Sequence, residues 1–270
     1  MRLTARMVAV VTGGSSGIGR SLALALADRG LRIALTDVEA PTLIEVAGEL
    51  RSSGADVLER AMDVADPSAV ASFASFVDEW FGPVDLVCNV AGVVGPRVPT
   101  WEQRAVDWQW VVQVNLFGVA NVLRAFLPPM VGRNAGHVVN VASIAGLAPI
   151  PGGGNAPYAA SKFGVVGLSE TLREELNEVA PAVGVTIVCP GPVATRIHDA
   201  ARNRPAALQG ERTGPEPRPA FANTATRISP TEAATQILAA VEEDRCYLLT
   251  NPENAPDIRA RMSRLLIDLP

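Results

Sequence analysis

The chain has 270 residues, 48% of them hydrophobic and 19% charged, so it can bury a large core and does not belong to the disordered class. Its formal net charge is −5 and it has no basic block, which argues against nucleic acid as a partner. Cys88, Cys189 and Cys246 lie far apart, and only His137 and His198 accompany them, so we expect neither a disulfide scaffold nor a metal site. These features favour a reduced, cytoplasmic setting and a single domain over residues 1–270.

Two apolar segments are unsuited to a membrane, and we expect no membrane partner. The first, Val8–Val11, is too short for the core of a signal peptide and is followed at once by a glycine-rich turn. The second, 134–161, has no charged residue, but its repeated glycines and prolines would interrupt a spanning helix. We expect this uncharged stretch to line something apolar inside the protein.

Short apolar runs alternate along the chain with longer segments of helical period, as in parallel strands joined by crossover helices. Gly30 is placed to end the first helix, Asp66-Pro67 to open the third, and Ser229–Glu232 has the spacing of a capping box. The pattern predicts an α/β fold: a doubly wound, mostly parallel, seven-stranded sheet with helices on both faces. The predicted strands are Val8–Val11, Arg32–Thr36, Asp56–Met62, Leu86–Asn89, Gly136–Val141, Thr186–Cys189 and Tyr247–Leu249.

A glycine-rich turn, Thr12–Gly19, joins the first predicted strand to the first helix. Its glycines let the backbone approach a pyrophosphate, and the start of the helix favours negative charge. Asp37 ends the second strand, where an acid accepts hydrogen bonds from a ribose 2′-hydroxyl and repels a 2′-phosphate. We therefore expect NAD rather than NADP, although Arg20 and Arg32 lie nearby and weaken this preference.

Tyr158 and Lys162 lie four residues apart at the start of a predicted helix, so their side chains share one face. An ammonium so placed lowers the pKa of a phenol from its ordinary value of about 10. This pair predicts a tyrosine that donates and accepts a proton near neutral pH.

These motifs together resemble the short-chain dehydrogenase/reductase family, with a Rossmann-like fold, from about Ala5 to Leu249. The glycine turn matches TGxxxGxG, and Tyr158–Lys162 matches YxxxK. Further matches are Asp63-Val64, Asn89–Gly92 (which departs from the family's NNAG at Val90), Asn115, Ser143 and Pro190–Thr195.

The resemblance implies four catalytic residues. Tyr158 would exchange a proton with the substrate oxygen, and Lys162 would lower the tyrosine pKa and hold the nicotinamide ribose. Ser143 would hydrogen-bond the substrate oxygen, and Asn115 would anchor a water that relays protons from Lys162. The implied cofactor-binding residues are Gly13, Ser15, Ser16, Gly17, Ile18, Gly19, Asp37, Asp63, Val64, Asn89, Ala91, Gly92, Tyr158, Lys162, Pro190, Gly191, Val193 and Thr195, with no metal.

Three segments are expected to wall the substrate pocket: 93–98, 143–157, and an irregular, arginine-containing lid at 196–227 whose alternative is a passive solvated insertion. The first two are apolar, which favours a secondary alcohol or ketone on a hydrophobic, cyclic or aromatic framework. The arginines of the lid leave an anionic substrate group open. The tail, 251–270, predicts a short amphipathic helix that packs on its own chain, although it could also cap a neighbouring subunit or the substrate cleft.

The leading hypothesis is an NAD-dependent oxidoreductase acting on CH–OH groups of a small molecule, with alcohol oxidation as the physiological direction. An NADP-dependent ketoreductase with the same residues is one alternative. The other is a non-catalytic NAD-sensing protein, whose usual mark is a lost tyrosine, lysine or serine, all present here. The resemblance also implies a homo-oligomer, a dimer or tetramer, formed through the helices over 110–127 and 162–179.

Overall fold

The structure is a computed structural model that describes residues 1–209 and 227–267. Its seven strands form one parallel sheet in the order β3-β2-β1-β4-β5-β6-β7, so the predicted fold class is confirmed. The largest shift from the predicted ends is in β6, which begins at Val183 instead of Thr186. The strands are β1 (Val8–Thr12), β2 (Arg32–Asp37), β3 (Val57–Ala61), β4 (Leu86–Asn89), β5 (Gly136–Val141), β6 (Val183–Cys189) and β7 (Tyr247–Leu249).

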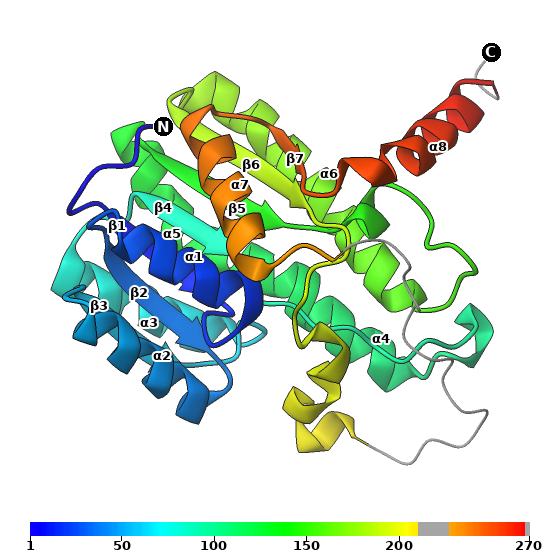
Figure 1. Ribbon diagram of the computed structural model, residues 1–270, viewed down its shortest axis with the longest axis horizontal. Coiled ribbons are helices and arrows are strands. Elements are labelled where there is room, and N and C mark those ends of the chain that lie inside the picture. Colours follow the sequence, from blue (N-terminus) through cyan, green and yellow to red (C-terminus); the bar gives the residue numbers. More distant parts are fainter. Residues whose placement is uncertain (210–226, 268–270) are drawn as a thin grey trace.

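Helices cover both faces of the sheet (Figure 1). One layer contains α1 (Gly17–Ala27), α2 (Ala40–Ser52) and α7 (Pro230–Glu242), and the other contains α3 (Pro67–Phe81), α4 (Ala105–Val112), α5 (Gly118–Arg133) and α6 (Ala156–Val179). A π-helix, η2 (Gln113–Phe117), joins α4 to α5. The remaining elements are the short turns η1 (Thr100–Glu102), η3 (Ile144–Gly146), η4 (Ile197–Asn203), η5 (Ala206–Leu208) and η6 (Pro252–Asn254), and the helix α8 (Ala255–Ile267).

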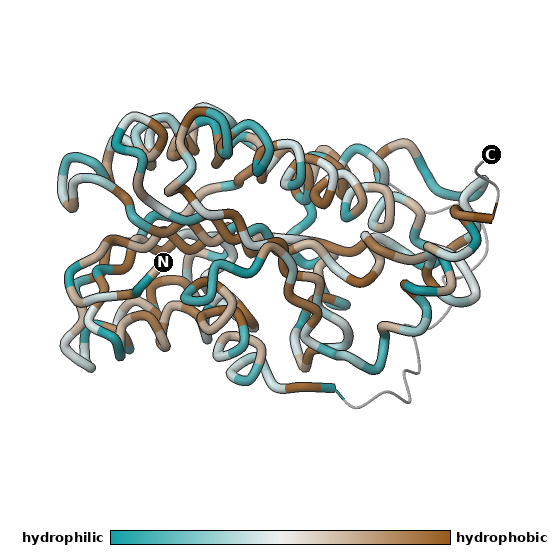
Figure 2. Tube along the Cα trace, turned by 90° about the horizontal axis from the view of Figure 1, so that it is seen from above, coloured by the Kyte–Doolittle hydropathy of each residue, from teal (hydrophilic) through white to brown (hydrophobic). Residues whose placement is uncertain are grey.

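Each helical layer has its own hydrophobic core against the sheet. Leu22 and Leu26 of α1 pack with Ile237 of α7 on one side. On the other side Phe73 of α3 meets Phe126 of α5 edge to face, with ring centroids 6.2 Å apart. The hydrophobic part of the trace accordingly concentrates in the central layer and along the inner sides of the helices (Figure 2). The sheet is thus a rigid base for the loops at its edges.

The predicted helix ends agree with the backbone. Gly30 has a positive φ of 79°, as its place after α1 requires. The Asp66 carboxylate accepts hydrogen bonds from the Ser68 and Ala69 amides at 2.8 and 3.2 Å and caps α3. Ser229 caps α7 in the same way, with its hydroxyl oxygen 3.0 Å from the Glu232 amide nitrogen.

The strand order reverses between β1 and β4, which lie side by side in the middle of the sheet. Thr12, at the end of β1, accepts hydrogen bonds from the Val90 and Ala91 amides at 3.0 and 3.1 Å and so ties the two strand ends together. Open α/β sheets bind ligands in the crevice at such a reversal, outside the carboxyl ends of the strands.

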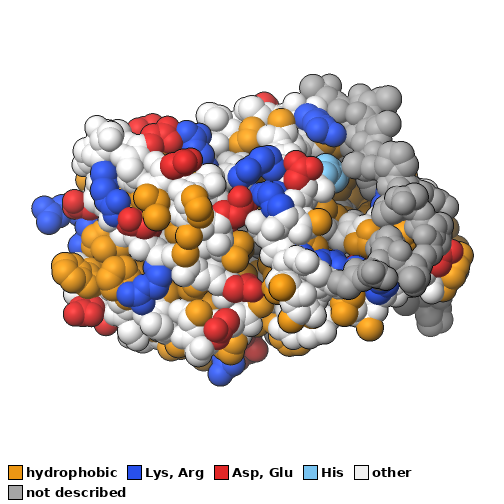
Figure 3. Space-filling view, turned by 90° about the horizontal axis from the view of Figure 1, so that it is seen from below, with side chains coloured by type: hydrophobic (Ala, Val, Ile, Leu, Met, Phe, Trp, Pro, Cys, Tyr) orange, Lys and Arg blue, Asp and Glu red, His pale blue; other side chains and the backbone are white. Residues whose placement is uncertain are grey.

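One helical stretch, Ala105–Arg133, is long and apolar enough by composition to cross a membrane. In this fold one side of the stretch packs on the protein, because Trp110, Val122, Phe126 and Met130 are buried in the core. The packing of α4 and α5 on the sheet therefore accounts for part of their apolar composition. On the face seen in Figure 3, acidic and basic side chains are intermingled.

The tail follows its prediction only in part. Helix α8 forms as expected, but none of its residues is buried, and it extends away from the sheet (Figure 1). The contacts of α8 with its own chain are confined to its first half, where Ile258 lines the cavity and the Arg261 guanidinium lies 4.9 Å from the centre of the Phe163 ring, whereas Met262 and Leu266 are 48% and 65% exposed. Leu269, and residues 210–226 of the predicted lid, lie outside the described residues.

Candidate active site

A cavity of about 600 Å³ lies at the carboxyl ends of the strands. Its walls come from the segments that follow β1 to β6, the start of α6, the turn η4 and the beginning of the tail. Among residues 1–209 and 227–267, no group of three or more His, Cys, Asp and Glu side chains is placed to hold a metal ion.

The glycine turn forms a cradle that leaves no room for a side chain at Gly13 or Gly19. A Cβ on Gly13, whose φ is +66°, would lie 2.8 Å from the Ala91 nitrogen, and one on Gly19 would lie 2.1 Å from the Gly13 oxygen. The side chain of Ser16 does not cap α1, and no acid occupies the first turn. The first backbone N–H groups of α1 therefore remain available to donate hydrogen bonds to an anion such as a pyrophosphate.

The Asp37 carboxylate faces the cavity and is held by three hydrogen bonds. Oδ2 accepts from the Ser15 amide at 3.0 Å and the Ser15 hydroxyl at 2.6 Å, and Oδ1 accepts from the Glu39 amide at 3.0 Å. A carboxylate accepts about four hydrogen bonds, so one remains for a ribose hydroxyl. Ser15 itself is buried, does not line the cavity and holds Asp37; its direct contact with the cofactor stays a prediction.

Glu39, which the sequence analysis missed, brings a second acid to this end of the cavity. Its carboxylate bonds to Arg202 at 2.5 Å, to Asn203 at 2.9 Å and to Arg196 at 3.5 Å. Burial alone would raise the pKa of Glu39, but hydrogen bonds from Arg202 and Asn203 outweigh it, so the pKa lies below its ordinary value. The first part of the predicted lid is thereby tied to the turn after β2.

The other expected cofactor contacts fall into two groups. Asn89 does not line the cavity: it is buried and donates to the Asn140 oxygen at 2.8 Å. Asp63 does line it, with one carboxylate oxygen accepting from the Ala65 amide at 2.9 Å. Val64, Ala91, Gly92, Pro190, Gly191, Val193 and Thr195 line it as well, together with Ser16, Gly17 and Ile18 of the glycine turn.

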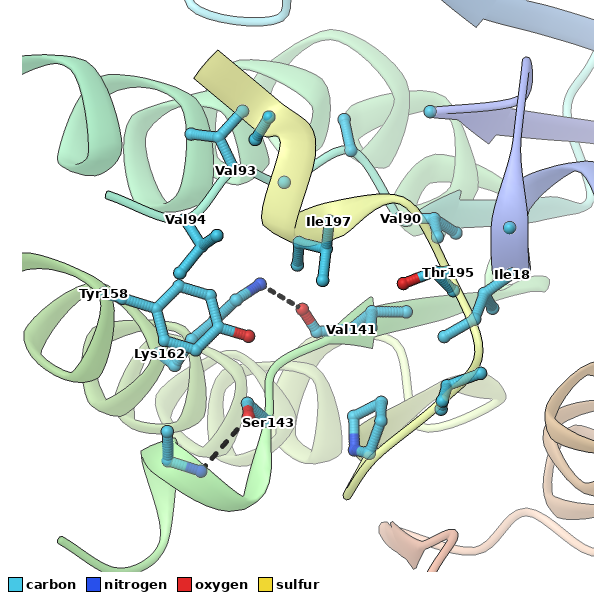
Figure 4. A pocket seen from close by; sticks show the side chains of 18 of the residues that line it. Ile18, Val90, Val93, Val94, Val141, Ser143, Tyr158, Lys162, Thr195 and Ile197 are labelled. Carbon is cyan, nitrogen blue, oxygen red and sulfur yellow. Dashed lines mark hydrogen bonds between the residues drawn. The ribbon is translucent and has the colours of Figure 1, made fainter. Parts of the chain in front are cut away.

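Tyr158, Ser143 and Lys162 converge in the middle of the cavity (Figure 4). Ser143 follows β5, and its hydroxyl oxygen accepts from the Ala145 amide at 3.1 Å. Lys162, one turn after Tyr158 on α6, donates from Nζ to the Val141 carbonyl oxygen at 2.8 Å. The i, i+4 spacing therefore brings the tyrosine and the lysine to one site, as predicted from the sequence.

In the free protein the pKa of Tyr158 does not follow the expectation that Lys162 lowers it. Burial raises the pKa of Tyr158 above its ordinary value, more than the hydrogen bond with Ser143 lowers it. Burial also lowers the pKa of Lys162 to about 8. The lysine Nζ is 5.8 Å from the centre of the tyrosine ring and is directed at a backbone carbonyl, so desolvation dominates both groups.

Asn115 lies in the π-helix η2, behind the cavity wall and fully buried. Its Oδ1 accepts from the Val93 amide at 2.8 Å, and its Nδ2 donates to the Val93 carbonyl at 2.9 Å and the Ser161 hydroxyl at 3.0 Å. The side chain therefore joins the segment after β4 to α6. Its role in a proton relay stays a prediction.

The substrate end of the cavity is mainly apolar, as expected. Val94 lies beside the Tyr158 ring, and Val93 and Ile197 of η4 are near it (Figure 4). Trp110, from α4, is a lining residue that the sequence analysis did not foresee, and Ile258 reaches the cavity from the tail, as the alternative of a tail over the substrate cleft expected. The polar side chains here are few among the described residues: Asn155, His198, Arg227, Asn254 and Asp257. Burial, and then the charge of Arg227, lower the pKa of His198.

A buried ion pair fixes the lid segment on the side away from Glu39. Arg204 lies 2.6 Å from the Asp107 carboxylate, and the two side chains are 8% and 0% exposed. The Arg204 guanidinium also stacks over the Trp110 ring at 4.4 Å. Residues 196–204 are thus anchored on both sides of the cavity, which argues against a passive insertion for this part of the segment.

Comparisons with known proteins fit this geometry. The model of a family described as short chain dehydrogenase matches residues 7–206. A 1-deoxy-11-beta-hydroxypentalenate dehydrogenase of Streptomyces avermitilis is 37% identical over 248 residues, 91% of this chain and 84% of that protein.

Two solved structures show similar chains with different nicotinamide cofactors. A short chain dehydrogenase/reductase from Burkholderia phymatum in complex with NAD has a TM-score of 0.92 at 36% identity, covering 100% of this chain and 98% of that one. A metagenomic short-chain oxidoreductase in complex with NADP has a TM-score of 0.72 at 30% identity, covering 92% and 98%. The fold therefore accommodates both cofactors, and the choice depends on the residues of the individual chain.

Proposed function

Because the chain belongs to the short-chain dehydrogenase family and is therefore an oxidoreductase, we propose that it transfers hydride between NAD and a hydrophobic secondary alcohol or ketone. One observation carries the proposal: the glycine cradle and Asp37 share a single cavity with Tyr158 and Ser143, next to apolar walls. The name of the Streptomyces avermitilis relative, a hydroxypentalenate dehydrogenase, supports a hydroxy compound as substrate.

Two acids support NAD over NADP. A phosphate on the ribose 2′-oxygen would face the Asp37 carboxylate and the neighbouring Glu39. The arginines at this end, Arg196 and Arg202, are already paired with Glu39. A 2′-phosphate would thus meet the Asp37 carboxylate, while both of these arginines are already engaged by Glu39.

In the proposed mechanism, bound NAD would accept the hydride, and its oxidised nicotinamide ring would bring a positive charge to the site. Ser143 hydrogen-bonds the substrate oxygen and orients it toward Tyr158. Tyr158 takes the hydroxyl proton as the alcohol is oxidised, which requires its raised pKa to fall on binding. Lys162 would hold the nicotinamide ribose, and its ammonium would stabilise the phenolate.

We also propose a cytoplasmic homo-oligomer, a dimer or tetramer, that acts on a small molecule and not on nucleic acid or membranes. Exposed apolar side chains on two long helical stretches support this assembly: Phe117, in η2, is 50% exposed, and Val179 at the end of α6 is 66% exposed. Light scattering coupled to size-exclusion chromatography tests it, and a monomer at working concentration would contradict it.

The test of the function is a titration of NAD and NADP against the purified protein, followed by absorbance assays with hydrophobic secondary alcohols and ketones. We expect tighter binding of NAD, and turnover that Tyr158→Phe removes while NADH still binds. Asp37→Ser should raise the affinity for NADP. Equal or tighter NADP binding by the wild type would favour the ketoreductase alternative, and binding without turnover across the panel would favour the NAD-sensing one.

A further inference from the structure

Asn155 occupies an unusual position at the start of α6. It follows Gly152, Gly153 and Gly154, all with positive φ, and is itself in the left-handed region at φ +64°. Its side chain does not cap the helix. The residue lines the cavity and is only 6% exposed. The backbone here is built to hold a buried amide against the cavity.

The amide of Asn155 has no hydrogen-bond partner within the described part of the chain. Its Oδ1 is sealed from solvent and unpaired. The Nδ2 atom is therefore the edge of the amide that can reach the cavity. An amide hydrogen that stays unpaired in a mainly apolar site is unfavourable, so an acceptor from the cavity would stabilise Nδ2. Asn254 also has a buried unpaired oxygen, but the residue as a whole is only half-buried. The inference therefore rests on Asn155.

The amide lies beside the reacting centre. Asn155 and Tyr158 are three residues apart, and the Tyr158 amide donates to the Asn155 carbonyl at 3.1 Å. Asn155 is the N-cap of α6, so its side chain leaves the chain within one turn of Tyr158, and both residues line the same cavity. The walls around this part of the cavity are mainly apolar, so an amide donor there meets little competition from other polar side chains.

We propose that Asn155 is a substrate-binding residue whose Nδ2 donates to a second acceptor oxygen of the substrate. This inference rests on the proposed function and deepens it. The substrate class is a hydroxy or keto compound that carries a second acceptor oxygen, of a carbonyl or a carboxylate, besides the reacting oxygen. A ketone without this second oxygen leaves the amide unpaired.

The test compares two ketones of the same ring, cyclohexane-1,4-dione and cyclohexanone, by kcat/KM with NADH. The variant Asn155→Gly removes the amide while keeping a residue that adopts positive φ freely. Asn155→Asp keeps the shape and replaces the donor with a carboxylate. The matched control is Asn134→Gly, because Asn134 is also left-handed, at φ +48°, but ends α5 and does not line the cavity.

We expect the wild type to prefer the dione, and Asn155→Gly to reduce that preference about tenfold, the effect of one lost hydrogen bond. Asn155→Asp should reduce it at least as much, and Asn134→Gly should leave it unchanged. Equal losses on both ketones, or an unchanged preference, would overturn the proposal.

A second readout separates this inference from the proposed function. Absence of turnover of any ketone by the wild type would refute the proposed function alone. The dione is then titrated against the complex with NADH, and nicotinamide fluorescence reports its binding. Weaker binding by Asn155→Gly than by the wild type supports the amide contact, and equal binding overturns it.

Discussion

Asp107→Ala tests how strongly the buried ion pair holds the wall of the cavity. Asp107 is fully buried, and Arg204, 2.6 Å away, is 8% exposed, so the substitution leaves a buried guanidinium without its acid. Breaking a buried pair in this way costs about 3–5 kcal/mol. In a domain of this size each kcal/mol lowers the Tm by about 2–4 °C, so we expect a fall of roughly 10 °C.

An exposed pair provides the control. Arg20 and Glu49 are also 2.6 Å apart, but their side chains are 39% and 47% exposed. Glu49→Gln should therefore cost less than about 1 kcal/mol. Denaturant unfolding and thermal scans measure both variants. Similar losses for Asp107→Ala and Glu49→Gln would refute the reasoning, because distance and not burial would then set the energy.

The effect of Asp107→Ala should also depend on pH. Burial would raise the pKa of Asp107, but hydrogen bonds from Arg104 and Arg204 lower it further, so the folded-state pKa lies below its ordinary value. The stabilisation is then complete above the unfolded-state pKa of about 3.9 and is lost as pH falls through the folded-state value. The gap between variant and wild type should narrow below pH 4, and a constant gap would contradict this assignment.

Lys162→Met should raise the free energy of unfolding at pH 7 by about 2 kcal/mol while abolishing turnover, since burial lowers the lysine pKa to about 8; a lower Tm would contradict this. Asp66→Ala should lower the urea midpoint of unfolding, and Asp66→Asn should lower it less, because the carboxylate caps α3; equal shifts would contradict the cap. Gly19→Ala should abolish NADH binding in a fluorescence titration, because its Cβ would lie 2.1 Å from the Gly13 oxygen, and an unchanged Kd would contradict the cradle.

The sequence predicted the strands and helices because the residues that define each element lie within that element or within three residues of its end. The strands are apolar runs, most of them buried on both faces, and Asp66 and Ser229 cap helices within three residues of themselves. Tyr158 and Lys162 could be placed together for the same reason, since one turn of α6 separates them. These predictions needed only the periodicity of the helix and the strand.

The missed features depend on contacts between distant parts of the chain. Glu39 meets Arg202 across 163 positions, and nothing near either residue in the sequence indicates the pair. Ser15 matches a cofactor motif, yet in the fold it holds Asp37. The amphipathic pattern of α8 predicted a helix correctly but carries no information about which surface would cover it.

The double role of Trp110 limits how the substrate range of this protein can be changed. Its ring lines the cavity, yet it is 2% exposed and belongs to the core shared by α3, α5 and α6. Enlarging the pocket by Trp110→Ala would thus remove part of the core, at about 3–5 kcal/mol. Ile150 and Pro151 also line the cavity, but they lie on its more exposed wall and are not part of the buried core. Engineering or natural divergence toward bulkier substrates therefore has its least destabilising route through the loop that precedes α6.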